Sequence, residues 1–306
     1  MPDDNIYTSA EDRTTALISY GYVDSVIPFI KPGDSVFAEG RVIEIKTLDT
    51  VDLTEYVSEA VTSWTSSDTA VATVSNGVVS SLDYTYTGST ECPFKYTDIT
   101  AVTTSNDTYI FRIKVIPRNV VLTDGQPYLS KYDFIAENVS YTRTYAEKYA
   151  NHLQCFYIPF DVEVTDELLD DFEFYRLYYI SKKDVNNDGM IDEDEPETMV
   201  LNKIKTGEIM KANMSYYIVP KAASTLIVTS YNSRLYSATN GKIICATTYN
   251  EYTLTGIYKS TNIKGNWTLA ADGTYKYFPN NTTLGPYRWY MSKRDRREIG
   301  AELENY

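Results

Sequence analysis

The sequence predicts an all-β protein in which a β-sandwich is followed by a second, larger, sandwich-like β-rich domain with one short helix. Three observations lead to this fold class. Tyrosine occurs 29 times among the 306 residues, and aromatic and β-branched residues favour strands. Apolar stripes of helical period are nearly absent, whereas short alternating runs interrupted by Gly, Asn, Asp and Pro recur. The length suits two domains, and a hydrophobic content of 43% suffices for packed cores.

The first half of the chain is predicted to form the β-sandwich. The stretch SWTSSDTAVATVSNGVVSSL, residues 63–82, contains three predicted strands, with a tight hairpin turn at Asn76-Gly77 between the second and the third. Trp64 is expected to anchor the core between the two sheets. YIFRIKVIP, residues 109–117, is predicted to be the closing strand.

These segments resemble the bacterial immunoglobulin-like domain, group 2. In that family a Trp-x-Ser-Ser-Asp segment leads to Val-Ala-x-Val and then to an Asn/Asp-Gly hairpin, and FAEG at residues 37–40 extends the match. The resemblance implies an Ig-like domain at residues 28–118, after an N-terminal segment at 1–27. It also implies a spacer or adhesive module without catalysis. The connection at residues 83–100 is longer than is usual in the family.

The second half is also predicted to be rich in strands. CFYIPF at residues 155–160 and YYIVP at 216–220 are apolar runs bounded by proline, which is typical of buried or edge strands. PYRWYM at 286–291 carries aromatic residues at alternate positions. Thr165 is the predicted N-cap of a short helix over DELLDD, residues 166–171, whose acidic start suits the helix dipole.

This half resembles a C-terminal domain of many secreted Bacteroidales cell-surface proteins. There a Tyr-Thr-Arg-Thr-aromatic strand precedes an aromatic-rich Pro-Phe-Asp/Glu segment. Residues 139–164 match it, except that Cys155 and Phe156 stand where a tryptophan is common. The resemblance implies a C-terminal β domain at residues 119–296, before a charged tail at 297–306. Further matches lie at residues 205–220, 252–258 and 284–291.

Residues 184–195, DVNNDGMIDEDE, have the spacing of a calcium-binding loop. Such a loop needs oxygen ligands at its first, third, fifth, seventh, ninth and twelfth positions, and a glycine at the sixth. Gly189 is at the sixth position, where a positive φ folds the chain around the ion. The alternative is a solvated acidic turn. The predicted Ca²⁺ ligands are Asp184, Asn186, Asp188, the main-chain carbonyl of Met190, Asp192 and Glu195.

The flanks of this loop indicate strands and not the helices of an EF-hand. FEFYRLYYI at residues 172–180 is dense in aromatic residues, and MVLNKIKTG at 199–207 also favours a strand. Pro196 disfavours a helix directly after the loop. The sequence therefore predicts a calcium clip at the tip of a β connection, which holds the loop in shape, and not a sensor that opens a helix pair.

The charge of the chain excludes some partners. Lys and Arg total 28 against 42 Asp and Glu, a net charge of −14, which repels nucleic acid and anionic membranes. No apolar run reaches the length of a membrane-spanning helix. Residues 1–15 are acidic and polar, the opposite of a secretory signal, so either such a signal precedes this chain or export does not use that route.

Few residues suit catalysis. Cys92, Cys155 and Cys245 form an odd, sparse set without a CxxC pair, and the latter two are expected to be buried thiols, with one disulfide still open as an alternative. His152 is the only histidine, which excludes HExxH metalloproteases and disfavours histidine-dependent nucleophiles. A glycoside hydrolase needs two paired carboxylates, but the acidic clusters here have simpler explanations. The chain is therefore predicted not to be an enzyme.

Aromatic residues near the end of the chain are candidates for glycan contact, because aromatic faces can stack on sugar rings. These candidates are Trp267, Tyr287, Trp289 and Tyr290. Each ring can equally belong to the core, which is the more frequent place for large aromatic residues.

The sequence as a whole favours a non-catalytic extracellular surface protein, a spacer or adhesion module stabilised by one Ca²⁺. The expected partner is an extracellular glycan or a surface protein of a host or bacterium. The chain is expected to be a monomer unless it is a virion component. The alternatives are a glycan-binding module, a decoration or fibre protein of a phage infecting Bacteroidales, and an enzyme.

Overall fold

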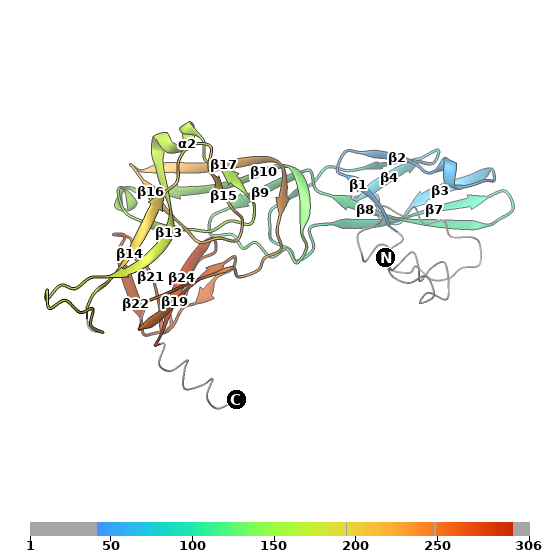
Figure 1. Ribbon diagram of the computed structural model, residues 1–306. Helices are drawn as coiled ribbons and strands as arrows, with labels where there is room; N and C mark the ends of the chain where they lie inside the picture. Colours follow the sequence, from blue (N-terminus) through green and yellow to red (C-terminus); the bar gives the residue numbers. More distant parts are fainter. Residues whose placement is uncertain (1–41, 194, 248, 296–306) are drawn as a thin grey trace, which may run out of the picture. The chain divides into compact units, whose positions relative to one another are not determined.

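The structure is a computed structural model that describes residues 42–193, 195–247 and 249–295 (Figure 1). The predicted N-terminal segment at 1–27, the FAEG motif at 37–40 and the charged tail at 297–306 lie outside these ranges. The described residues are nearly all in strands, turns and loops, so the all-β class is confirmed. The chain divides into unit 1, residues up to Thr85 with Pro93–Arg118, and unit 2, Tyr86–Cys92 with residues from Asn119 onward.

Unit 1 is a sandwich of two sheets around one hydrophobic core. Its four-stranded sheet has the order β1 (Val42–Lys46), β8 (Thr108–Ile116), β7 (Lys95–Thr103) and β3 (Val61–Ser66). Its three-stranded sheet has the order β2 (Thr50–Asp52), β5 (Val78–Ser81) and β4 (Ala72–Ser75). Apolar side chains alternate along these strands, so that one face of each sheet is buried. The shared core includes Ile43, Ala72, Val79, Ile99, Phe111 and Ile113.

The predicted hairpin between residues 72 and 81 is confirmed. β4 and β5 are antiparallel and pair Ser75 with Val78 around a two-residue turn. Asn76 and Gly77 have φ values of 50° and 85°, which is the backbone that a tight hairpin turn demands. Trp64 packs against the core of unit 1, as predicted, but it is not fully buried. It lies on the edge strand β3, is half-buried, and stacks on the fully buried Phe111 at 6.3 Å between ring centroids.

Gly77→Ala is expected to destabilise unit 1 by about 2–3 kcal/mol. The positive φ of residue 77 is unfavourable for alanine. In addition, the new Cβ atom would overlap Thr54 Cγ2 and lie 3.1 Å from the Trp64 ring. Gly125→Ala in unit 2 is the matched control, since Gly125 has a φ of 83° and nothing lies within 4 Å of its added Cβ. It should cost about 1 kcal/mol, the backbone contribution alone. Chemical denaturation of the full chain measures the loss of stability in each variant. Equal losses for Gly77→Ala and Gly125→Ala would contradict the clash with Thr54.

Unit 2 contains three larger sheets within its described residues. The first has the order β17 (Ser224–Leu235), β10 (Phe134–Tyr145), β9 (Asn119–Thr123) and β6 (Thr85–Tyr86). The second has the order β11 (Gln154–Phe156), β16 (Tyr216–Pro220), β13 (Phe172–Lys182) and β14 (Glu197–Lys203). The third has the order β18 (Lys242–Ala246), β19 (Asn250–Ile257), β24 (Arg288–Asp295), β21 (Asn266–Leu269) and β22 (Tyr275–Phe278).

Two pairs of short strands, one α-helix and the 3-10 helix η3 (Glu147–Tyr149) complete the described part of unit 2. The pairs are β12 (Val162–Glu163) with β15 (Ile209–Met210), and β20 (Thr261–Asn262) with β23 (Thr283–Leu284). The predicted helix is confirmed as α2 (Asp166–Asp171), and the Thr165 hydroxyl accepts a hydrogen bond from the main-chain N–H of Leu168 at 3.4 Å. The second and third sheets share a core of Cys155, Ile180, Tyr217, Tyr252, Leu254, Trp289 and Met291.

The long connection at residues 83–100 is divided between the units. Within the expected domain 28–118, the segment Tyr86–Cys92 groups with unit 2. There β6 pairs with β9, and the Tyr86 ring packs edge-on against Tyr128 and Phe134 at 6.3 and 5.9 Å. The division after Arg118 falls at the predicted boundary. Residues 86–92 depart from the predicted domain 28–118, because aromatic packing and strand pairing hold them to the first sheet of unit 2.

Candidate functional site

The predicted calcium loop, residues 184–195, connects β13 to β14, which form an antiparallel hairpin. Both flanks are therefore strands, as predicted, although the second strand ends at Lys203. Asn187 and Gly189 have φ values of 59° and 88°, so the chain turns sharply in the middle of the loop. The glycine at the sixth position thus has the backbone conformation that the spacing requires.

Side-chain oxygens organise the first half of the loop. The Asp184 carboxylate accepts hydrogen bonds from the main-chain N–H groups of Asn187 at 2.6 Å and Gly189 at 2.8 Å. The Asn186 side chain accepts from the N–H of Asp188 at 3.0 Å, and Asp188 accepts from the N–H of Met190 at 2.8 Å. These local turns hold the first, third and fifth positions in a defined conformation.

Glu195, the twelfth position, closes the loop. Its side chain is 6% exposed. One carboxylate oxygen accepts from the N–H of Val185 at 2.6 Å and the other from the N–H of Asp192 at 3.2 Å. The Lys182 ammonium donates to the carbonyls of Asp192 and Glu193. The two ends of the loop are therefore joined through one buried carboxylate.

The donor chemistry of the loop fits calcium. Its predicted ligands are hard oxygen donors, and carboxylate oxygens retain lone pairs while they accept hydrogen bonds from N–H groups. Within the described ranges, no group of three or more His, Cys, Asp or Glu side chains is gathered closely enough to hold a metal ion. The residues that would hold calcium are Asp184, Asn186, Asp188, Met190 through its carbonyl, Asp192 and Glu195.

The loop is fastened to the third sheet of unit 2. The Tyr249 hydroxyl donates to the carbonyl of Ile191 at 3.0 Å, and the Lys182 ammonium lies 4.5 Å from the centroid of the Tyr249 ring. Beyond the loop, Glu197 accepts from the Thr247 hydroxyl at 2.7 Å and from the Asn250 side-chain amide at 3.1 Å. The shape of the loop is thus coupled to the connection between β18 and β19.

Two of the four candidate glycan contacts are core residues. Tyr287 and Trp289 are both 0% exposed, so neither ring offers a face to a sugar, and these two expectations are wrong. The Trp289 indole N–H donates to the carbonyl of Tyr216 at 2.7 Å, and the Tyr287 ring packs on Tyr141 at 4.8 Å. Trp267 and Tyr290 are half-buried. Alternation along β24 places Tyr290 on the face opposite to Trp289.

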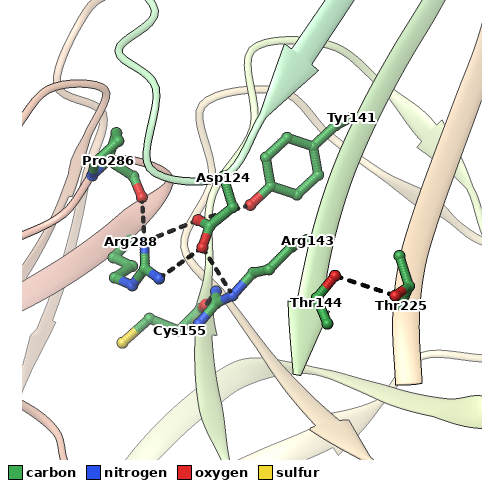
Figure 2. Close-up of polar contacts among 8 residues, drawn as sticks. All are labelled: Asp124, Tyr141, Arg143, Thr144, Cys155, Thr225, Pro286 and Arg288. Atoms are coloured by element: carbon green, nitrogen blue, oxygen red, sulfur yellow. Dashed lines mark hydrogen bonds and ion pairs between the residues drawn. The ribbon is translucent and has the colours of Figure 1, made fainter. Parts of the chain in front are cut away.

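A polar cluster that the sequence did not indicate lies inside unit 2 (Figure 2). Asp124, just after β9, accepts two hydrogen bonds from the Arg288 guanidinium at 2.9 and 3.0 Å. The Arg143 Nε lies 3.7 Å from the same carboxylate, and the Tyr141 hydroxyl donates to it at 3.2 Å. No spacing signal marks this cluster, because 164 positions separate Asp124 from Arg288.

This cluster has the features of a structural tie between strands. Arg143 is 5% exposed and also donates to the carbonyl of Cys155 at 2.8 Å. Burial raises the pKa of Tyr141 well above its usual value, so its hydroxyl stays protonated and donates. One carboxylate serves two guanidinium groups and one hydroxyl. In a site with little water, the negative charge of Asp124 and the positive charges of the two arginines therefore compensate one another.

Cys155 has the properties of a structural thiol. It is buried in the core of unit 2, and burial raises the pKa of its thiol, whereas a nucleophilic cysteine needs a lowered pKa. Cys245 packs against the same core, but it is only half-buried, so the expectation of a buried thiol is met in part. Among the described strands, its strand β18 is at the edge of the third sheet.

A scan against protein-family models found no match for this chain, and a search of curated proteins found none either. Among the described residues, no helix combines the length and apolar character needed to cross a membrane.

Proposed function

We propose that the chain is a non-catalytic spacer or adhesion module outside the cell, whose second unit is stabilised by one calcium ion. Unit 1 would be the bacterial Ig-like domain and unit 2 the C-terminal domain of a secreted cell-surface protein. Support comes from the motifs of residues 63–82 and 139–164, and from a β architecture that suits a rigid spacer. The acidic surface suits a protein that attracts cations.

The observation that carries the calcium proposal is the closed loop between β13 and β14. Its twelfth residue, Glu195, bridges the N–H groups of Val185 and Asp192, and the short polar side chains before it are turned by hydrogen bonds to the main chain. A bound cation would draw together and compensate the carboxylates that this short segment carries. Calcium would thus stiffen the tip of the hairpin without opening a helix pair.

Removal of calcium is expected to lower the melting temperature of unit 2. Extracellular calcium loops bind with dissociation constants of about 10⁻⁴–10⁻³ M. At ten times that concentration, binding adds about 1.4 kcal/mol, or about 4 °C for a unit of this size. Calorimetry of the full chain with calcium and with a chelator measures this difference.

Two double variants show whether the loop is responsible. Asp184→Ala with Glu195→Ala should abolish the difference between calcium and chelator. Asp170→Ala with Asp171→Ala removes the same charge from the exposed end of α2 and should preserve the difference. A wild-type chain that melts at one temperature under both conditions would refute the calcium clip.

A further inference from the structure

A cavity of about 270 Å³ lies in unit 2 between the second and third sheets. Its apolar lining comes from Ile180 on β13, Met199 on β14 and Met291 on β24. Strand pairing explains why Met291 and Trp267 of the third sheet lie side by side at the cavity. Met291 is opposite Trp267, which in turn is opposite Tyr277, so these side chains form one row across a single face of the sheet.

Three aromatic rings form walls of the cavity, and partners hold each of them. Trp267 packs against Tyr277 at 5.2 Å between ring centroids. The Tyr275 hydroxyl is hydrogen-bonded to the Tyr217 hydroxyl at 2.7 Å. The Tyr252 hydroxyl donates to the Glu197 carboxylate. The rings are therefore positioned before any ligand arrives, which lowers the entropic cost of binding.

One charged pair completes the lining of the cavity. The Glu197 side chain is 12% exposed, and the Lys293 ammonium lies 3.7 Å from one of its carboxylate oxygens. The Lys293 side chain is 43% exposed, so its ammonium retains donors for a ligand. The Glu197 carboxylate already accepts from Thr247, Asn250 and Tyr252, so about one acceptor position remains for a sugar hydroxyl.

We propose that this cavity binds one pyranose ring of a neutral glycan. The C–H groups of such a ring carry partial positive charge and suit the negative face of an aromatic ring, and the sugar hydroxyls match the acceptor and donor of the charged pair. The volume admits a single ring, so that the remainder of the glycan would lie outside the cavity. An aromatic wall with a few convergent polar groups is the usual composition of a binding site.

The charged pair disfavours other classes of ligand. A cationic ligand would meet the ammonium of Lys293, which already compensates Glu197, and an anionic ligand would meet the carboxylate. A wholly apolar group would remove water from the pair without replacing its hydrogen bonds. A neutral hydroxylated ring avoids all three penalties.

The test is a titration of the full chain with a panel of neutral pyranosides. The panel comprises the methyl glycosides of glucose, galactose, mannose and fucose, together with N-acetylglucosamine. Saturation-transfer NMR reports binding. Because the chain has three tryptophans, the part of the tryptophan fluorescence change that Trp267→Ala removes reports the environment of Trp267. At least one sugar is expected to saturate. Trp267→Ala should weaken its binding about ten-fold or more, and Lys293→Met, at a half-exposed position, about three-fold or more.

Tyr231→Ala is the matched control, because Tyr231 on β17 is 74% exposed and outside the cavity; this variant should bind as the wild type does. The proposal is overturned if no sugar of the panel saturates the wild-type chain, or if Trp267→Ala binds unchanged. Where Trp267→Ala does not fold, unchanged binding by Lys293→Met has the same consequence.

This inference deepens the adhesion role proposed above and names its ligand class. The two proposals fail separately. A melting temperature that is the same with calcium and with a chelator would refute the calcium clip. Sugar binding would still be measured independently by NMR. A panel without a binding sugar refutes the pyranose site, whereas a chelator effect on melting would still support the clip.

Discussion

Asp124→Asn is expected to destabilise unit 2 by about 3–5 kcal/mol, and to lower its melting temperature by about 10 °C. The asparagine keeps the shape of the side chain but removes the negative charge. The guanidinium of Arg143, 5% exposed, would then remain in the interior without a compensating anion, beside the partly exposed guanidinium of Arg288. Calorimetry and urea denaturation measure the loss.

A surface ion pair of the same unit provides the control. Glu91 pairs with Lys131, and their side chains are 63% and 66% exposed. Glu91→Gln should therefore change the stability by at most about 1 kcal/mol. Adding Arg143→Met to Asp124→Asn removes one of the stranded charges and should recover part of the loss. Equal melting temperatures for Asp124→Asn and Glu91→Gln would show that the cluster does not tie the strands together.

Trp289→Ala is expected to cost unit 2 about 3–5 kcal/mol. The indole is fully buried, packs edge-on against Tyr217 at 4.8 Å and donates to the carbonyl of Tyr216. Truncation would leave a cavity between the second and third sheets and an unpaired carbonyl. Denaturation of the purified variant measures the change in the free energy of unfolding.

Two further variants separate the contributions of Trp289. Trp289→Phe keeps most of the apolar volume and removes the N–H donor, so its loss should be smaller than that of the alanine variant. Tyr231→Ala, at an exposed position, should stay within about 0.5 kcal/mol of the wild type. If Trp289→Ala unfolded like the wild type, the ring would not be part of the core.

Local features of the fold were predictable from short segments. The hairpin at Asn76-Gly77 follows from residues that tolerate a positive φ, and the start of α2 from the hydroxyl of Thr165. The predicted calcium loop is equally local, since its oxygens, its glycine and its closing glutamate occupy twelve consecutive positions. What the sequence did not reveal there is the hydrogen bond from Tyr249 to Ile191, which depends on the packing of the distant connection between β18 and β19.

The aromatic residues near the end of the chain were the least predictable part of the site. Trp267, Tyr287, Trp289 and Tyr290 have the same sequence signature, yet the structure buries Tyr287 and Trp289 and places Trp267 at a cavity. The difference depends on which face of β24 or β21 each residue occupies, and on which sheet covers that face. Neither is encoded within one strand.

The elements that could be predicted are those whose causes lie within a few residues, because backbone preferences and side-chain capping act over that range. They are several of the strands, the hairpin, the capped helix and the loop of oxygen donors. The order of the sheets, the assignment of residues 86–92, the Asp124 cluster and the cavity beside Trp267 became visible in the folded chain alone. The reason is that these features join residues far apart in the chain, whose proximity arises only when the sheets pack.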